Sequence, residues 1–106
     1  MENELILENI EVRPTVYWYA KKMEMRLRQK DAEKGREGWH DGKLLYYLAK
    51  SADCMRTIHD IIKIDKPIPN RSIHTVIKKC YDGGNFFMML ADNLRDELIK
   101  RGIPKK

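Results

Sequence analysis

The segment from Ile73 to Arg101 constrains the fold more than any other part of the chain. Ser72 is placed to cap its start, and Gly102 follows its end, so the segment is typical of one long helix. Gly83 and Gly84 fall in its middle, where each glycine costs up to about 1 kcal/mol relative to alanine. Two adjacent glycines therefore indicate close helix packing, a local bend or a ligand near the backbone.

Four large apolar residues follow this glycine pair almost at once, and they are Phe86, Phe87, Met88 and Met89. Successive residues of a helix point in different directions, so a run of this kind surrounds the helix with apolar side chains. We interpret these residues as core and interface and expect the helix to be buried on more than one side. That burial favours a dimer or a tetramer.

Two shorter helices are predicted before it. From Val16 to about Lys30, apolar residues recur at helical spacing, and Pro14 fits the first turn. The buried stripe is Val16, Tyr19, Ala20, Met23 and Leu27, with Trp18 off the stripe. A second helix is expected from Lys43 to Ile64, between a glycine-rich loop at 31–42 and a two-proline span at 65–70. One row along this helix consists of Leu44, Leu48, Met55 and Ile62. The neighbouring row consists of Leu45, Ala52 and His59, and Ser51 and Ile58 lie on the other side.

The length of 106 residues fits one domain, which we divide into an N-terminal arm, 1–15, and a helical domain, 16–106. No run of 18 apolar residues is present and the start of the chain is acidic, so neither a membrane helix nor a signal peptide is expected. Cys54 and Cys80 form no disulfide framework, and their expected role is buried packing. A cytoplasmic location is the simple interpretation.

The net charge of +5 favours polyanions as partners, namely nucleotides, nucleic acid or an acidic protein. The alternative is that each basic cluster is a solvated helix face. Much of the positive excess sits in three clusters, which are Lys21, Lys22, Arg26, Arg28 and Lys30; Lys78 and Lys79; and Lys100, Arg101, Lys105 and Lys106.

The segment Lys79–Asn93 resembles the signature helix of the MazG-like nucleoside triphosphate pyrophosphohydrolases, which reads Glu-x-x-Asp, small residues, Asn-Phe and Met-Met-x-Ala-Asp-Asn. Val16–Glu24 is similar to the opening helix of that family, and Gly38–Asp41 to its Gly-Trp loop. Leu44–Ile62 stands where its carboxylate-rich helix belongs. The resemblance covers about residues 16–101 and implies an all-α, MazG-like helical bundle that is oligomeric.

The resemblance also implies a chemistry. Enzymes of this family cleave nucleoside triphosphates between the α and β phosphates, using Mg²⁺ held by Glu-Glu-x-x-Glu and Glu-x-x-Asp on two helices. In this chain Lys50, Ser51 and Cys54 align with the first motif, and Lys79 and Asp82 with the second. Asp82 is the one carboxylate at these aligned positions. A shift in register brings in Asp53, so Asp82 and Asp53 are the candidates for metal ligands.

Lys79 places an ammonium where the family holds a metal. The repulsion between this ammonium and a metal ion would be on the order of 4 kcal/mol for each pair of unit charges at 4 Å. The same ammonium could instead hold a phosphate without metal. It could also simply reach solvent or pair with Asp82. The candidate ligand-binding residues are Lys79, Asp82, Ser51, Cys54 and Trp39.

The leading hypothesis is a homo-oligomeric MazG-like protein without standard pyrophosphohydrolase activity or a cofactor, which binds a nucleotide or a protein partner. A phage or mobile-element origin would suit so compact a chain. One alternative is an active Mg²⁺-dependent enzyme with a rearranged carboxylate site built from Asp82, Asp53, Asp60 and Asp92. Another is a basic nucleic-acid-binding protein in which Tyr17, Trp18 or Trp39 stacks on bases. The scattered His40, His59 and His74 do not predict a zinc site.

Overall fold

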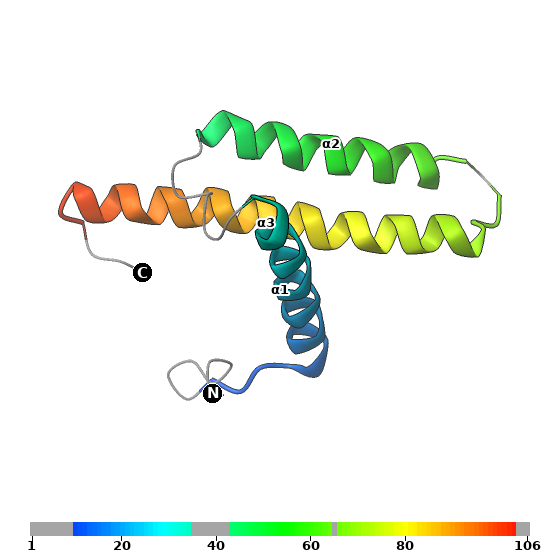
Figure 1. The fold of residues 1–106 in the computed structure, drawn as a ribbon, viewed down its shortest axis with the longest axis horizontal. Helices are drawn as coiled ribbons and strands as arrows, with labels where there is room; N and C mark the ends of the chain where they lie inside the picture. Colours follow the sequence, from blue (N-terminus) through cyan, green and yellow to red (C-terminus); the bar gives the residue numbers. More distant parts are fainter. Residues whose placement is uncertain (1–9, 35–42, 65, 104–106) are drawn as a thin grey trace.

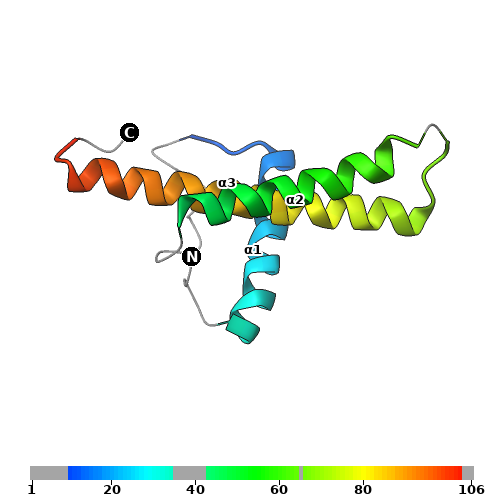
Figure 2. The same cartoon turned by 90° about the horizontal axis from the view of Figure 1, so that it is seen from above.

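The computed structural model describes residues 10–34, 43–64 and 66–103. The described residues form three helices, α1 (Pro14–Lys34), α2 (Leu44–Ile62) and α3 (Asn70–Lys100). Helices α2 and α3 lie side by side and antiparallel, and α1 crosses the middle of α3 (Figures 1 and 2). The all-α prediction is confirmed. None of the described helices is long and apolar enough to span a membrane.

Helix α3 is closed by Gly102, as the sequence predicts. Gly102 has a φ of 78°, the left-handed conformation that glycine adopts without strain. The N–H of Gly102 donates to the carbonyl of Ile99, and the N–H of Ile103 donates to that of Leu98, both at 2.9 Å. These two bonds form a Schellman motif, which satisfies carbonyls left open at the end of the helix.

The start of α3 differs from the prediction. Ser72 is not the N-cap, because α3 begins at Asn70 and Pro69 occupies the cap position without a side-chain hydrogen bond. Pro69 is extended, and its carbonyl accepts a hydrogen bond from the N–H of Ile73 at 3.0 Å. The proline thus ends the connection and opens the helix, and Ser72 falls in the first turn.

Helix α1 continues four residues beyond the predicted end, from Asp31 to Lys34. These residues contain neither glycine nor proline, so nothing local stops the helix before Gly35. Its first residue is Pro14, as the prediction of a first-turn proline requires. Helix α2 lies within the predicted span. Residues 1–9 of the predicted arm and Trp39, in the glycine-rich loop, lie outside the described residues.

The described chain buries few side chains. Tyr47 and Cys54 are its buried apolar residues, and Ser51 and Asn85 its buried polar ones. Val16, predicted to be buried, is 54% exposed because it precedes the contact of α1 with α3. In the predicted interface helix, Phe87 is 47% exposed, and the rest of Phe86–Leu90 is half-buried. Burial of that segment by another copy stays a prediction.

Candidate functional site

The two glycines of α3 face different neighbours. A Cβ at Gly84 would lie 2.5 Å from Tyr19 Oη and 3.3 Å from Met23 Sδ, both on α1. A Cβ at Gly83 would lie 3.5 Å from the Cβ of Cys54 on α2, an ordinary van der Waals separation. Of the three explanations offered for the glycine pair, close helix packing is therefore the one observed, and a side chain at Gly84 would require Tyr19 to move.

The Tyr19 hydroxyl fixes this crossing, because it donates a hydrogen bond to the backbone carbonyl of Cys80 on α3. The Tyr19 ring also lies 6.0 Å from that of Tyr81, and Trp18 packs edge-on against Tyr81 at 5.8 Å. Burial raises the pKa of the Tyr19 phenol, and the nearby Cys80 and Tyr81 raise it further. The phenol therefore stays protonated and keeps donating.

Arg26 of α1 and Asp82 of α3 form a two-pronged ion pair across the same crossing. Arg26 Nε donates to Asp82 Oδ1 at 2.9 Å, and Arg26 Nη2 donates to Asp82 Oδ2 at 3.0 Å. The two side chains are 18% and 15% exposed, so solvent screens the pair only in part. Both carboxylate oxygens of Asp82 thus already accept a charged hydrogen bond, and a metal ion would have to compete with the guanidinium.

Ser51 and Cys54 lie one turn apart on the face of α2 that packs against α3. The Ser51 hydroxyl is 1% exposed and donates to the carbonyl of Tyr47 at 2.9 Å. Burial raises the pKa of the Cys54 thiol and is the largest effect. The positive charges of Lys79 and Lys50 lower this pKa, and the negative charges of Asp82 and Asp53 raise it. Because the net shift is upward, Cys54 remains a thiol and is a poor nucleophile or metal ligand.

Of the five residues that the resemblance aligns with a metal site, Lys50, Ser51 and Cys54 lie on α2, and Lys79 and Asp82 lie on the facing helix α3. Lys79 and Asp82 act electrostatically on Cys54 across the packing of α2 on α3. Lys79 is half-buried, and no ion pair joins it to any residue that the structure describes. One of the alternatives for Lys79, an ion pair with Asp82, is not formed; the hydrogen bonds to both oxygens of Asp82 come from Arg26.

The other carboxylates of the alternative enzyme site each have a basic partner. Asp53 accepts from Arg56 at 2.9 Å, Lys63 Nζ lies 3.4 Å from Asp60, and Asp92 pairs with Arg95 at 2.6 Å. Asp53 and Asp60 are both 57% exposed. Within residues 10–34, 43–64 and 66–103, no three His, Cys, Asp or Glu side chains gather as metal ligands would.

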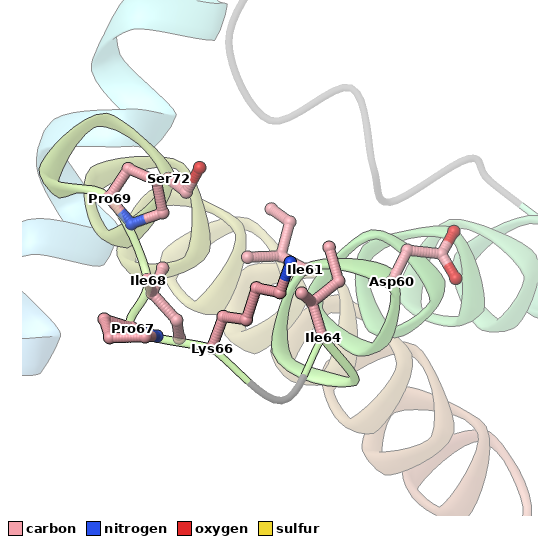
Figure 3. A pocket seen from close by; sticks show the side chains of 8 residues that line it. All are labelled: Asp60, Ile61, Ile64, Lys66, Pro67, Ile68, Pro69 and Ser72. Carbon is pink, nitrogen blue, oxygen red and sulfur yellow. The ribbon is translucent and has the colours of Figure 1, made fainter.

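A cavity of about 170 Å³ lies elsewhere, where the connection between α2 and α3 meets both helices (Figure 3). Its walls are largely apolar, with the Lys66 side chain across it and the Asp60 carboxylate directed away. Drug-sized ligands occupy cavities of about 300–1,000 Å³, so this one is too small for a nucleoside triphosphate. Its lining residues are Asp60, Ile61, Ile64, Lys66, Pro67, Ile68, Pro69 and Ser72.

Sequence reasoning missed Arg26 and Asn85. Asn85 is 4% exposed and its Nδ2 donates to the carbonyl of Met23 at 3.0 Å, while its Oδ1 has no partner in the described structure. Arg26 carries a signal that could have identified it, since it follows Tyr19 by seven residues and Met23 by three. A charge on the apolar face of a helix requires an opposite charge on the helix that it meets.

Comparison of the chain with protein families, with curated proteins and with solved structures finds no match.

Proposed function

We propose that this chain is a MazG-like, oligomeric helical bundle that has lost standard pyrophosphohydrolase activity and acts by binding a nucleotide or a protein partner. The observation that carries the proposal is the pairing of Asp82 with Arg26. Asp82 is the one acid kept at the positions aligned with the metal site. Its charge is neutralised from within the protein, so the site has little to offer a divalent cation.

Lys79 adds a second positive charge beside this pair. With Asp82 neutralised by Arg26, the ammonium of Lys79 leaves the site net positive, and it attracts an anion more readily than a metal ion. A phosphate or a carboxylate fits this charge, because lysine binds either as a compact cation with three donors. The proposed ligand is thus a nucleotide bound through its phosphates, or an acidic segment of a protein.

A single-stranded nucleic acid is the second candidate, and an observation on α1 favours it. Tyr17 and Trp18 are 43% and 46% exposed, and Lys21 Nζ lies 5.8 Å from the centre of the Tyr17 ring. Exposed aromatic rings beside basic side chains are the usual platform for stacked bases. The rearranged carboxylate enzyme has less support, because its acids are paired with arginine or lysine.

Release of pyrophosphate tests the main proposal. Purified protein with Mg²⁺ or Mn²⁺ is incubated with each common ribo- and deoxyribonucleoside triphosphate, and little or no pyrophosphate is expected. Arg26→Ala, which frees Asp82, serves as a companion variant and is also expected to be inactive, because a single carboxylate holds Mg²⁺ poorly. Robust turnover by the wild type that disappears in Asp82→Ala would restore the enzyme hypothesis.

A further inference from the structure

The cavity between the end of α2 and the start of α3 is shaped by a stiff stretch of backbone. Pro67 and Pro69 both line it, and the ring of each proline fixes its own φ. The residue before a proline is held extended as well, so Lys66 and Ile68 also have little backbone freedom. The wall formed by the connection therefore keeps its shape without a ligand, and this lowers the entropy cost of binding one.

The size and lining of the cavity define the body of a ligand that would fit it. Ile61 near the end of α2, Ile64 just after it and Ile68 of the connection supply aliphatic wall. An apolar cavity of about 150 Å³ stays dry and takes up a molecule the size of benzene. At about 170 Å³, this cavity fits an aliphatic body of about four to six non-hydrogen atoms. A phosphate group inside it would fit poorly, because apolar walls cannot satisfy its oxygens.

Lys66 supplies a positive charge at this apolar cavity. Its side chain extends across the cavity, whereas the Asp60 carboxylate is directed away (Figure 3). Asp60 already has a basic partner, since Lys63 Nζ lies 3.4 Å from its Oδ1. In the part of the chain that the structure describes, no acidic side chain pairs with Lys66, and the hydroxyl of Ser72, which also lines the cavity, has no hydrogen-bond partner. The cavity thus offers two donors to a ligand.

We propose that this cavity binds a short aliphatic monocarboxylate, with its apolar body against the isoleucines and its carboxylate paired with the ammonium of Lys66. A charge-assisted hydrogen bond from Lys66 offsets the loss of water around the carboxylate, which would be costly to bury unpaired. The hydroxyl of Ser72 can donate to the second carboxylate oxygen. The site does not depend on the proposed function, because Ser72 precedes Lys79 by about two turns of α3.

Titration of the full, isotopically labelled chain with isovalerate, followed by NMR, tests the site. Binding is expected to saturate and to shift Ile61 and Ile68 most, because both line the cavity. Isovaleramide has nearly the same shape and no charge, so it is expected to bind at least about fivefold more weakly. Acetate keeps the charge and lacks the aliphatic body, so it is expected to bind at least about tenfold more weakly.

Lys66→Gln tests the charge. This variant is expected to bind isovalerate at least about fivefold more weakly, while its affinity for isovaleramide stays unchanged. Arg71→Gln is the matched control, because Arg71 is exposed, adjoins Ser72 in the sequence and does not line the cavity. It also removes one positive charge and is expected to bind isovalerate within about twofold of wild type, since exposed charges are screened. Circular dichroism checks that each variant stays helical.

Four results would each overturn the proposal. They are an isovalerate titration of wild type that does not saturate, equal affinity for isovalerate and isovaleramide, equal losses in Lys66→Gln and Arg71→Gln, and shifts that centre on Lys79 instead of Ile61 and Ile68. The last result would assign the anion to the site of the proposed function. Failure of the cavity and failure of the proposed function are therefore distinguished by the residues whose signals move.

Discussion

Tyr19 lies so close to Gly84 that the hydroxyl of one occupies the space of a Cβ on the other. The approach is held by the hydrogen bond from Tyr19 to the carbonyl of Cys80. Helix α1 therefore crosses α3 at a point where α3 presents only backbone, and Gly84 is required there by its neighbour rather than by its own conformation.

Gly84→Ala and Gly83→Ala should therefore have opposite effects. The methyl at 84 must displace the Tyr19 ring and Met23, so the free energy of unfolding should fall by about 1–3 kcal/mol. The methyl at 83 meets Cys54 at an ordinary 3.5 Å and favours the helix, so stability should rise by up to about 1 kcal/mol. Urea unfolding of the two variants measures both. Equal effects would show that α1 does not pack on α3 at Gly84.

The ion pair between Arg26 and Asp82 should couple α1 to α3 energetically. In a double-mutant cycle with Arg26→Gln and Asp82→Asn, a coupling energy of about 1–2 kcal/mol is expected, because the pair is two-pronged and mostly shielded from water. The exposed pair of Arg56 and Asp53, on one turn of α2, is the comparison and should give about 0.2–0.5 kcal/mol. Equal coupling in both cycles would contradict the assignment of Asp82 to a shielded site.

Stability should decline at alkaline pH through Cys54 and Tyr19. Burial raises the pKa of both groups in the folded protein, so the unfolded chain loses these protons first. The contribution of Cys54 is fully present below the unfolded thiol pKa of about 8.5 and is lost as pH rises through the folded pKa, whereas that of Tyr19 declines only above the unfolded phenol pKa of about 10.

Urea midpoints measured between neutral and alkaline pH should show this decline. It should be shallower in Cys54→Ala than in the control variant Cys80→Ala, which keeps the buried thiol. Identical pH profiles for the two variants would show that ionisation of Cys54 is not linked to unfolding.

The helices were largely predictable because their signals are local. The apolar spacing and Gly102 were sufficient to place α2 and the end of α3 within one or two residues. The start of α3 was not, because Ser72 carries a stronger capping preference than Pro69 but the helix already begins at Asn70. The capping preferences of single residues cannot decide between two possible helix starts when the path of the preceding connection determines where the helix begins.

For the candidate site, the sequence predicted which residues of each helix take part, but not every contact between the helices. The resemblance placed Lys79 and Asp82 near Ser51 and Cys54, and the packing of α2 on α3 brings these residues together. The partner of Asp82 was not foreseen, because Arg26 lies 56 residues away and their approach depends on the angle at which α1 crosses α3. Of the residues that α2 buries, Ser51 stood on one of the predicted sides of the helix, whereas Tyr47 and Cys54 were in none of the predicted rows, because which face of α2 meets α3 is a tertiary property.

Anion binding at Lys79 should need no metal. Since Arg26 neutralises Asp82, the ammonium of Lys79 is the net charge that the site presents to a ligand. Calorimetry with nucleoside triphosphates should show binding that persists in EDTA and weakens as salt rises, because partly exposed charges are screened. Lys79→Glu should weaken this binding at least about tenfold by replacing attraction with repulsion, and it should raise affinity for Mg²⁺. Lys78→Glu, a neighbouring exposed lysine, is the matched control and should bind as wild type does. If neither wild type nor Lys79→Glu binds any nucleotide, the site is vestigial, and the binding function belongs to the outer surface and a macromolecular partner.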